Sequence, residues 1–328
     1  MGLVRPLKWP RLTLLLRSAY LADRGGLSSL PTRAQSHFLC GDHVISYISS
    51  LKIRHNLSNE WWNNFPSVFK HCTLPSLDRV KVQVWFLAGV EPTLYDCCTN
   101  SCCAFTGHCA NFTMCDICNH PRLRNTSEPY KAFSYFPLIP QLSKLYEHPV
   151  LSWLLRHRHL HKHTEGKYTD VFDGMHYRRL KQRPVKVGDT TYDHFYFCGE
   201  RDIAIGLSTD GFSPFKSWKH SAWPIIIFNY NLPPHVRFHQ QNLLCVGVIP
   251  GPKGVWDIDS FILPLVEELA KLAVGVSAYD SQNCEIFCLR THLILAFGDM
   301  PAIAKILCMM GHNGLCPCQM CKIIGVRM

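Results

Sequence analysis

The residues best suited to chemistry are cysteines, which gather in two short stretches of the chain. Seven fall within the 22 residues from 97 to 118, and three lie at 316–321. Each stretch contains a C-x-x-C unit, Cys115–Cys118 and Cys318–Cys321. Because thiolates hold Zn²⁺ tetrahedrally, this clustering predicts zinc binding in a reducing compartment. The total of 17 cysteines is odd, which excludes a fully paired set of disulfides within one chain.

Two aspartates form a second chemical feature. Asp210 follows the apolar stretch 203–208, and Asp299 follows the apolar stretch 292–297. If both stretches are neighbouring strands, these carboxylates face one pocket and offer hard oxygen ligands to Mg²⁺ or Mn²⁺. The alternative is structural, with Asp210 in an Asp-Gly turn and Asp299 as a helix N-cap.

The elements that must position these acids follow from the apolar pattern after residue 200. Four apolar runs predict strands, and two stretches with helical spacing predict helices. The strands are expected at 203–208, 223–230, 243–249 and 292–297, and the helices at 261–273 and 302–310. This order matches the opening of a ribonuclease-H-like fold, in which the first and fourth strands lie side by side. The expected fold class is therefore α+β, with a mixed sheet and helices.

A basic stretch at 156–186 contains nine Lys/Arg and three acidic residues. Such a run favours salt-dependent contacts with DNA phosphates, and Trp153, Tyr168 and Tyr177 could stack on bases. The alternative is a solvated, partly disordered linker. Asp170 and Asp173 lie within this stretch, where a turn with side-chain caps is the simplest interpretation. The expected DNA contacts are Arg156, Arg158, Lys162, Arg178, Arg179, Lys181, Arg183 and Lys186.

The composition sets wider limits. Apolar residues make up 47% of the 328 residues and charged residues 18%, which excludes bulk disorder. No apolar run reaches the roughly 18 residues of a membrane-spanning helix, which argues against an integral membrane protein. Segments 1–40 and 156–186 carry net charges of +5 and +6 and so account for the whole excess of +10. Spaced arginines before residue 38 are typical of a mitochondrial presequence or of a disordered basic leader.

Several longer motifs resemble one family. They are Leu207-Ser-Thr-Asp-Gly-Phe-Ser-Pro-Phe215, Asn229-Tyr-Asn-Leu-Pro-Pro234, Val248-Ile-Pro-Gly-Pro-Lys253, Gly298-Asp-Met-Pro-Ala302 and Pro317-Cys-Gln-Met-Cys321. Together they resemble transposases of the CACTA (En/Spm) superfamily, and most closely the Plavaka branch of fungi. The resemblance covers roughly residues 80–328.

The resemblance implies a ribonuclease-H-like core with an Asp-Asp-Glu triad. It carries the first acid onto Asp210 and the second onto Asp299, which would hold catalytic Mg²⁺ or Mn²⁺. The third acid lies in the family beyond a Cys/His insertion, and Glu267, Glu268 and Glu285 do not match its position. Glu267 and Glu268 look like a solvated helix face. We therefore expect a chain cut off before the third acid and without strand-transfer activity of its own.

The resemblance also implies two structural zinc sites. A C-x₃-C pair followed by C-x-x-C maps onto Cys98, Cys102, Cys115 and Cys118, as a zinc-ribbon-like module. Cys97, Cys103 and Cys109 are then spare, either as small apolar packing or as ligands shifted by one place. A second site would use His312, Cys318 and Cys321, with Cys316 at a position where the family has another residue; the alternative is a terminus that binds nothing stably.

These expectations give a domain scheme and two functions. The leading hypothesis is a transposon-derived, nuclear, cut-and-paste DNA transposase that binds DNA and no membrane, with a homo-oligomer left open. The second is a non-catalytic, zinc-dependent DNA-binding or interaction protein; a mitochondrial location rests on the N-terminus alone. The scheme places a basic leader at 1–40, a helical or mixed region at 41–94, the cysteine module at 95–122, a basic connector at 123–199, the partial core at 200–310 and the start of the Cys/His insertion at 311–328.

Overall fold

The computed structural model describes the chain from the cysteine module through the last predicted helix with short gaps, and only parts of it before that. The described residues are 52, 57–68, 74–80, 89–125, 127–212, 221–251, 254–311, 314–318, 321 and 323–324. The predicted basic leader at 1–40, with its presequence-like arginines, lies outside them.

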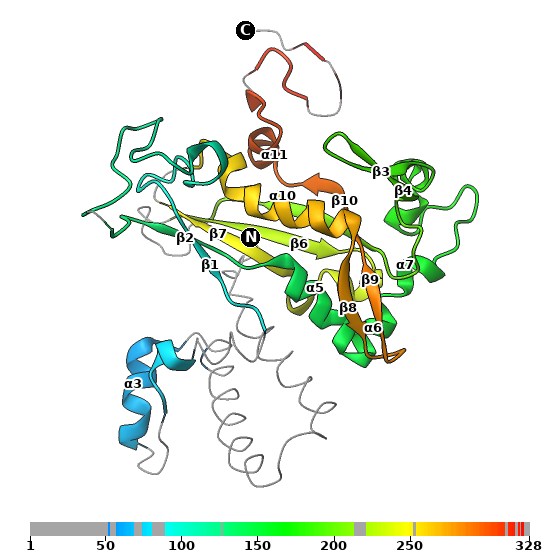
Figure 1. The fold of residues 1–328 in the computed structure, drawn as a ribbon, viewed down its shortest axis with the longest axis horizontal. Coiled ribbons are helices and arrows are strands. Elements are labelled where there is room, and N and C mark those ends of the chain that lie inside the picture. The colour runs from blue at the N-terminus through cyan, green and yellow to red at the C-terminus, as the bar shows by residue number, and fades with distance from the viewer. Residues whose placement is uncertain are drawn as a thin grey trace, which may run out of the picture.

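A six-stranded mixed sheet forms the centre of the molecule (Figure 1). Its strands follow the order β1-β2-β7-β6-β5-β10. All neighbouring pairs are antiparallel except β5 and β10, which are parallel. The bounds are β1 Thr93–Asp96, β2 Ala132–Tyr135, β5 Ile203–Thr209, β6 Ala222–Asn229, β7 Leu244–Pro250 and β10 Thr291–Phe297.

The four strands predicted from apolar runs match β5, β6, β7 and β10 to within one or two residues. The prediction that the first and fourth of them are neighbours is confirmed, because β10 pairs directly with β5. Strands β1 and β2 extend the sheet beyond β7 and were not predicted. Their short length and irregular flanks give little periodic signal.

Helix α10 (Ile258–Val274) makes the crossover between β7 and the β10 side of the sheet and lies across one face (Figure 1). Asp257 caps its start, accepting a hydrogen bond from Ser260 N at 3.2 Å, and Gly275 ends it with φ 125°. Phe261, Leu265 and Leu272 recur at helical spacing and are fully buried against the sheet. A parallel pair of strands needs such a crossover, which explains why this long helix precedes β10.

Apolar packing covers both faces of the sheet. Ile203, Ile205 and Leu207 of β5 belong to the core under α10, while Ala204 packs into a second core with Phe172 and Tyr230. The alternation follows from the two-residue period of a strand. Burial on both faces explains why β5 and β6 are almost continuously apolar in sequence.

The segment from 157 to 195 is folded, so the alternative of a disordered linker is wrong for this part of the basic stretch. It contributes Phe172 and Tyr177 to the second core and ends in the hairpin of β3 (Pro184–Val187) and β4 (Thr190–Phe195). A further hairpin, β8 (Val276–Asp280) with β9 (Glu285–Leu289), precedes β10. Other helical elements with described bounds are α3 Asn59–Val68, η1 Gly107–Cys109, α5 Leu138–Glu147, α6 Pro149–Leu154, α7 His157–Leu160, η2 Val171–Asp173, α8 Met175–Leu180, α9 Pro234–Arg237, η3 Gln240–Asn242 and α11 Met300–Ile306.

None of the helices in the described residues is both long and apolar enough to span a lipid bilayer.

Candidate metal centres and basic surface

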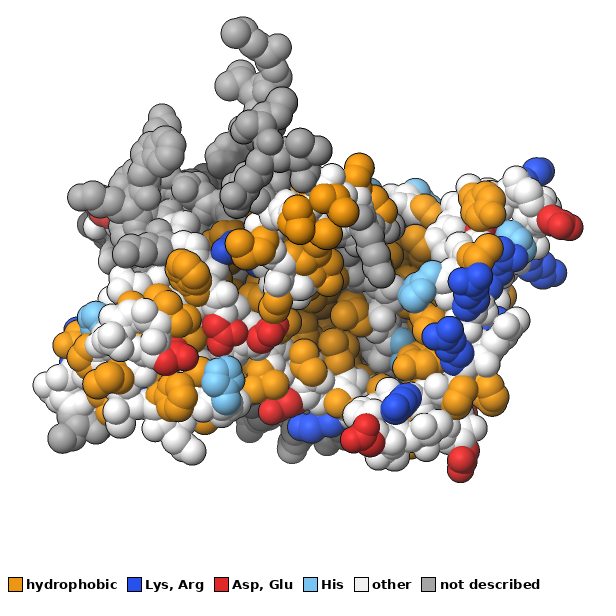
Figure 2. Space-filling model, turned by 90° about the horizontal axis from the view of Figure 1, so that it is seen from above, with side chains coloured by type: hydrophobic (Ala, Val, Ile, Leu, Met, Phe, Trp, Pro, Cys, Tyr) orange, Lys and Arg blue, Asp and Glu red, His pale blue; other side chains and the backbone are white. Residues whose placement is uncertain are grey.

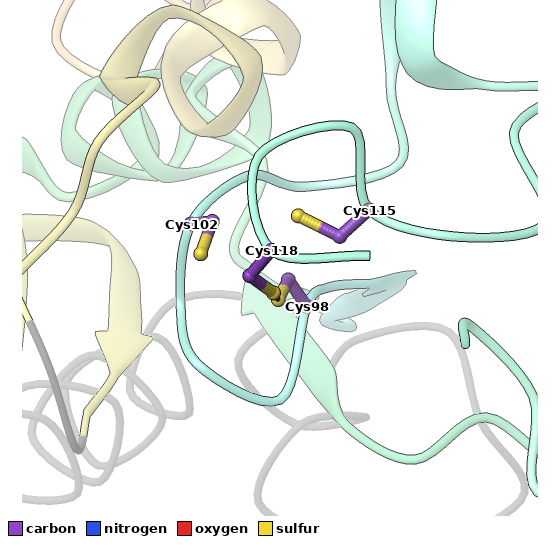
Figure 3. Close-up of side chains that lie close together, drawn as sticks. All are labelled: Cys98, Cys102, Cys115 and Cys118. Carbon is purple, nitrogen blue, oxygen red and sulfur yellow. Dashed lines mark hydrogen bonds between the residues drawn. The ribbon is translucent and has the colours of Figure 1, made fainter. Parts of the chain in front are cut away.

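Four cysteines of the predicted module come together. The sulfur atoms of Cys98, Cys102, Cys115 and Cys118 all lie within 4.8 Å of one another. Figure 3 shows their side chains converging from two loops. The first three residues are buried and Cys118 is partly exposed. This set of four sulfurs can hold a metal ion such as zinc.

Two tight loops create this convergence. After Cys98 the chain turns through Ser101, which adopts φ 63°, and the amide of Asn100 donates to Cys98 Sγ at 3.4 Å. After Cys118 it turns through Asn119, at φ 57°, whose amide donates to Cys115 O at 2.8 Å. Asparagine tolerates this left-handed conformation better than most residues. The short spacing within each pair therefore keeps the two sulfurs of each loop close together.

The geometry and electrostatics of the four sulfurs fit a zinc ion. Zn–S bonds of about 2.3 Å place two thiolates of a tetrahedral site about 3.8 Å apart, and Cys98 Sγ lies 3.4 Å from Cys118 Sγ. Burial acts to raise the pKa of Cys118, but hydrogen bonds from Asn100, the backbone at His120 and Cys98 outweigh it and lower the pKa to about 6. Burial raises the pKa of Cys102, and the neighbouring sulfurs raise it further. A cation at the centre would allow all four thiols to ionise.

Lys131 is a charged neighbour of this module that the sequence analysis did not single out. Its ammonium group donates to Thr99 O at 3.1 Å and Ser101 Oγ at 2.9 Å, and also to Gly251 O. It thus ties the Cys98 loop to the end of β7. Its position before β2, 13 residues after Cys118, gave no sequence signal.

Asp210 and Asp299 follow neighbouring parallel strands. Ser208 of β5 pairs with Phe297 of β10, so each aspartate comes two residues beyond the same pair. Beyond that pair, a Cβ on Gly298 would lie 3.3 Å from Thr209 O. The ends of β5 and β10 therefore stay adjacent up to the two aspartates. Both aspartates are exposed. The topology therefore brings the two acids to the same edge of the sheet.

The sequence offered a structural alternative for each acid, a helix N-cap for Asp299 and an Asp-Gly turn for Asp210, and only the first is present. Asp299 is the N-cap of α11, since its Oδ1 accepts a hydrogen bond from Ala302 N at 2.8 Å. Asp210 and Gly211 do not form a turn; the chain runs on to Phe212, which pairs with Ala222. Glycine is needed at 211 because a Cβ there would lie 2.5 Å from the ring of Trp223.

Two of the three glutamates considered above, Glu268 and Glu285, are engaged in other contacts. Glu268 accepts hydrogen bonds from Leu138 N at 2.5 Å and Ile139 N at 3.2 Å, and from the Tyr135 hydroxyl. The expectation that it belongs to a solvated helix face is wrong, because it caps the start of α5. Glu267 is exposed, as expected, and Glu285 pairs with Arg201 at 2.7 Å.

One residue of the expected DNA-contact set is buried, so the prediction is wrong for it. Arg158 is only 5% exposed, and its guanidinium donates to Asp202 O at 2.8 Å and Glu200 O at 3.0 Å. It stabilises the interior of the segment and cannot reach a phosphate. Tyr177, expected as a stacking residue, is likewise buried, with its ring 4.9 Å from that of Phe172.

The other members of the set lie at or near the surface. Arg156 is half-buried and donates to Asn283 Oδ1 at 2.9 Å, and Arg178 donates to His163 at 3.2 Å. Figure 2 shows Lys and Arg side chains gathered at the end of the molecule that carries β3 and β4. The exposed members of the expected set, all on the segment that leads into and begins this hairpin, are Lys162, Arg179, Lys181, Arg183 and Lys186.

A pocket of about 190 Å³ opens within this basic surface. Among the described residues, its lining consists of His176, Leu180 and two of the expected arginines, Arg179 and Arg183. His176 was not anticipated, although it lies three residues before Arg179 on one helix face, a spacing that sequence alone displays.

Asp170 and Asp173 now have a structural explanation. Asp170 caps η2 and forms a buried, bidentate pair with Arg237, with both oxygen–nitrogen distances 2.8 Å. Asp173 accepts hydrogen bonds from the Thr169 amide at 2.7 Å, and from His161 at 2.8 Å and His163 at 2.9 Å. The expected turn with side-chain caps is thus present, and it anchors the histidine tract.

His157, His161 and Asp170 also place one ligand atom each within 4.8 Å of the others. Their hydrogen-bonding capacity is already used, however. His157 Nε2 lies 2.8 Å from Asp170 Oδ2, which Arg237 also contacts. The guanidinium charge would repel a cation, so this cluster is better explained as the anchor of η2.

The second predicted zinc site is only partly described. Cys318 and Cys321 belong to the described residues, as does Cys316, whereas His312 lies outside them. This site stays a prediction.

Comparison with known families supports a relationship to transposases. Residues 173–326 match the model of Transposase family tnp2. The matched stretch begins at Asp173 and includes β5, β10 and both aspartates. Searches among curated proteins and among solved structures gave no significant match.

Proposed function

We propose that this transposase-related protein derives from a cut-and-paste DNA transposase of the CACTA type, Plavaka branch. In this proposal, strands β7-β6-β5-β10 are the first part of a ribonuclease-H-like sheet, and Asp210 and Asp299 are its first two metal-binding acids. The observation that carries the proposal is the parallel pairing of Ser208 with Phe297, which sets both acids at one edge. The match of residues 173–326 to a transposase family supports it.

The two carboxylates suit a hard divalent cation. Both are exposed, and Asp299 uses only Oδ1 for its cap, leaving Oδ2 without a hydrogen bond among the described residues. Mg²⁺ or Mn²⁺ bound here would activate a water or 3′-hydroxyl and stabilise the leaving oxygen of a phosphodiester. The protein's own part is to fix the two acids on adjacent strand ends, where the sheet limits their movement.

Metal binding directly tests the proposal that Asp210 and Asp299 hold a cation at this edge of the sheet. We expect Mn²⁺ to bind the full chain, measured by electron paramagnetic resonance titration. Asp210→Asn and Asp299→Asn should each weaken binding by about tenfold or more, since each removes one charged ligand. Asn keeps the N-cap acceptor at 299, so folding is preserved. Asp189→Asn, an exposed acid in the turn between β3 and β4, is the control and should bind Mn²⁺ like the wild type.

Catalysis is a separate question, because Glu268 and Glu285 are engaged away from the two aspartates. We therefore propose that residues 1–328 alone have no strand-transfer activity. In a plasmid-nicking assay with Mn²⁺, we expect no turnover. Nicking by the wild type that disappears in Asp210→Asn would overturn this part of the proposal while leaving the metal site intact.

The exposed basic surface supports a second candidate, a non-catalytic, zinc-dependent DNA-binding protein that acts in the nucleus. Figure 2 shows Lys and Arg side chains gathered at the end of the molecule that carries β3 and β4. Arg179 and Arg183 line one pocket there, and Lys162, Lys181 and Lys186 are exposed on the same segment of the chain. Such a surface would contact DNA phosphates without regard to sequence, and salt would weaken the binding.

The salt dependence of binding to a short duplex tests this surface. Arg179→Ala/Arg183→Ala should weaken binding and reduce the slope of log K against log salt by about 2, since each phosphate contact contributes about 1. Arg124→Ala/Lys271→Ala removes the same charge from exposed positions elsewhere and should change the slope little. Equal slopes for both double variants would contradict the assignment.

A further inference from the structure

Two cysteines outside the four-sulfur set lie beside it. Cys103 and Cys109 are fully buried, and their sulfurs lie within 4.8 Å of each other and of an Asp116 carboxylate oxygen. The three residues come from the loop after Cys102, the end of η1 and the interior of the C-x-x-C unit. Two thiols and a carboxylate at this spacing form three corners of a tetrahedral zinc shell.

Cys115 lies beside this group on the Cys103 side and can offer a fourth ligand. Its sulfur lies 3.8 Å from Cys103 Sγ, the separation of about 3.8 Å expected for two thiolates on one zinc ion. Cys115 also belongs to the four-sulfur set. One thiolate therefore stands between the two groups of ligands.

The surroundings of Cys103 differ from those of an ordinary buried cysteine. Cys97 packs in the main apolar core with side chains such as Phe133 and Tyr135. Cys103 instead packs in a cluster composed of Cys98, Cys102 and Cys115. Small apolar packing explains Cys97 but leaves this concentration of sulfur, with an aspartate at its edge, unexplained.

We propose that Cys103, Cys109 and Asp116 hold a second zinc ion and that the Cys115 thiolate bridges it to the ion in the four-sulfur set. Three thiolates and one carboxylate suit Zn²⁺, and binding releases the thiol protons to solvent. The proposal does not depend on DNA cleavage, so the tests of the two can fail separately.

Zinc content of the full chain tests the proposal. All proteins carry Cys318→Ser/Cys321→Ser, so that the predicted C-terminal site contributes no ion. Native mass spectrometry should find two zinc ions in this background and one after Cys103→Ala or Cys109→Ala. Cys97→Ala is the matched control, a buried cysteine in neither ligand group, and should keep two. One ion in the background protein, or two in both ligand variants, would overturn the proposal.

The bridge has its own signature. With ¹¹³Cd in place of zinc, two resonances should appear, split by coupling through the shared sulfur; uncoupled resonances would overturn the bridge and thus the proposal. If the buried-cysteine variants do not fold, Asp116→Asn serves instead, because Asp116 is exposed. It should let a chelator remove one of the two ions first, whereas Asp189→Asn, at an exposed acid in the turn between β3 and β4, should not. Simultaneous loss of both ions from Asp116→Asn and from the background protein would contradict two distinct sites.

Discussion

The cysteine module and the carboxylate edge reach their geometry by opposite routes. In the module, Cys98 and Cys102 lie four residues apart and Cys115 and Cys118 three apart, so tight loops create the site locally. At the edge, Asp210 and Asp299 lie on separate strands, and only the parallel pairing of β5 with β10 makes them neighbours.

The two regions also differ in burial. The module's sulfurs are mostly buried and contact one another, whereas both aspartates are exposed. A buried set of thiols needs a cation to ionise, so metal and folding are coupled there. Exposed carboxylates are solvated without a metal, so ion binding at the edge is separable from folding. The comparison predicts opposite responses to losing a ligand.

The largest expected effect is on the module. Cys115→Ser/Cys118→Ser should remove the zinc held there and unfold the module, because structural zinc contributes on the order of 10 kcal/mol to small sites. Metal analysis and circular dichroism measure this, and a chelator should reproduce it in the wild type. Cys198→Ser/Cys288→Ser changes two exposed cysteines outside the ligand groups. This variant should retain its bound zinc and its folded structure. Unchanged zinc in the first variant would refute the site.

Asp170 provides a buried carboxylate to set against Asp210 and Asp299. Asp170→Asn should cost about 3 kcal/mol in the free energy of unfolding, because it leaves the 3%-exposed Arg237 charge without its partner. Chemical denaturation at neutral pH measures this cost. Asp189→Asn should change stability by less than about 0.5 kcal/mol.

The pH dependence of that cost follows from the pKa of Asp170. Burial raises the pKa, but hydrogen bonds from Arg237 and His157 outweigh it, so the pKa lies below its ordinary value. Such a carboxyl stabilises the fold above its unfolded-state pKa of about 3.9 and loses that contribution as the pH falls through the folded pKa. The difference between wild type and Asp170→Asn should therefore be complete at pH 7 and shrink below about pH 4. A constant difference down to pH 2 would contradict this.

Substitution of Asp299 has the smallest expected effect on the free energy of unfolding. It also distinguishes most clearly between a structural cap and a metal ligand. Asp299→Ala removes the N-cap of α11 and should cost about 1 kcal/mol, while Asp299→Asn should cost almost nothing. Both variants should lose Mn²⁺ affinity equally. If only the alanine variant loses affinity, the residue acts as a cap and not as a ligand.

Sequence reasoning succeeded where the signal was local or periodic. The cysteine motif of the family that the chain resembles identified the four sulfurs that gather, and apolar runs located β5, β6, β7, β10 and α10. It failed where a charged side chain folds inward. Arg158 was counted as a surface cation but donates to buried carbonyls, and Glu268 was counted as solvated but caps α5. Neither residue differs in its local pattern from an exposed one.

The sequence by itself determined that thiols gather in two short groups, at 97–103 and 115–118, because a few residues of chain limit how far the sulfurs within each group can separate. It also determined the four strands β5, β6, β7 and β10, because burial on a sheet imposes its own spacing of apolar residues. Only the tertiary structure decided that Arg237 neutralises Asp170, that Cys103 packs among sulfurs while Cys97 packs among hydrocarbons, and that β1 and β2 extend the sheet beyond β7. Those outcomes depend on contacts between segments distant in the chain, which no local pattern encodes.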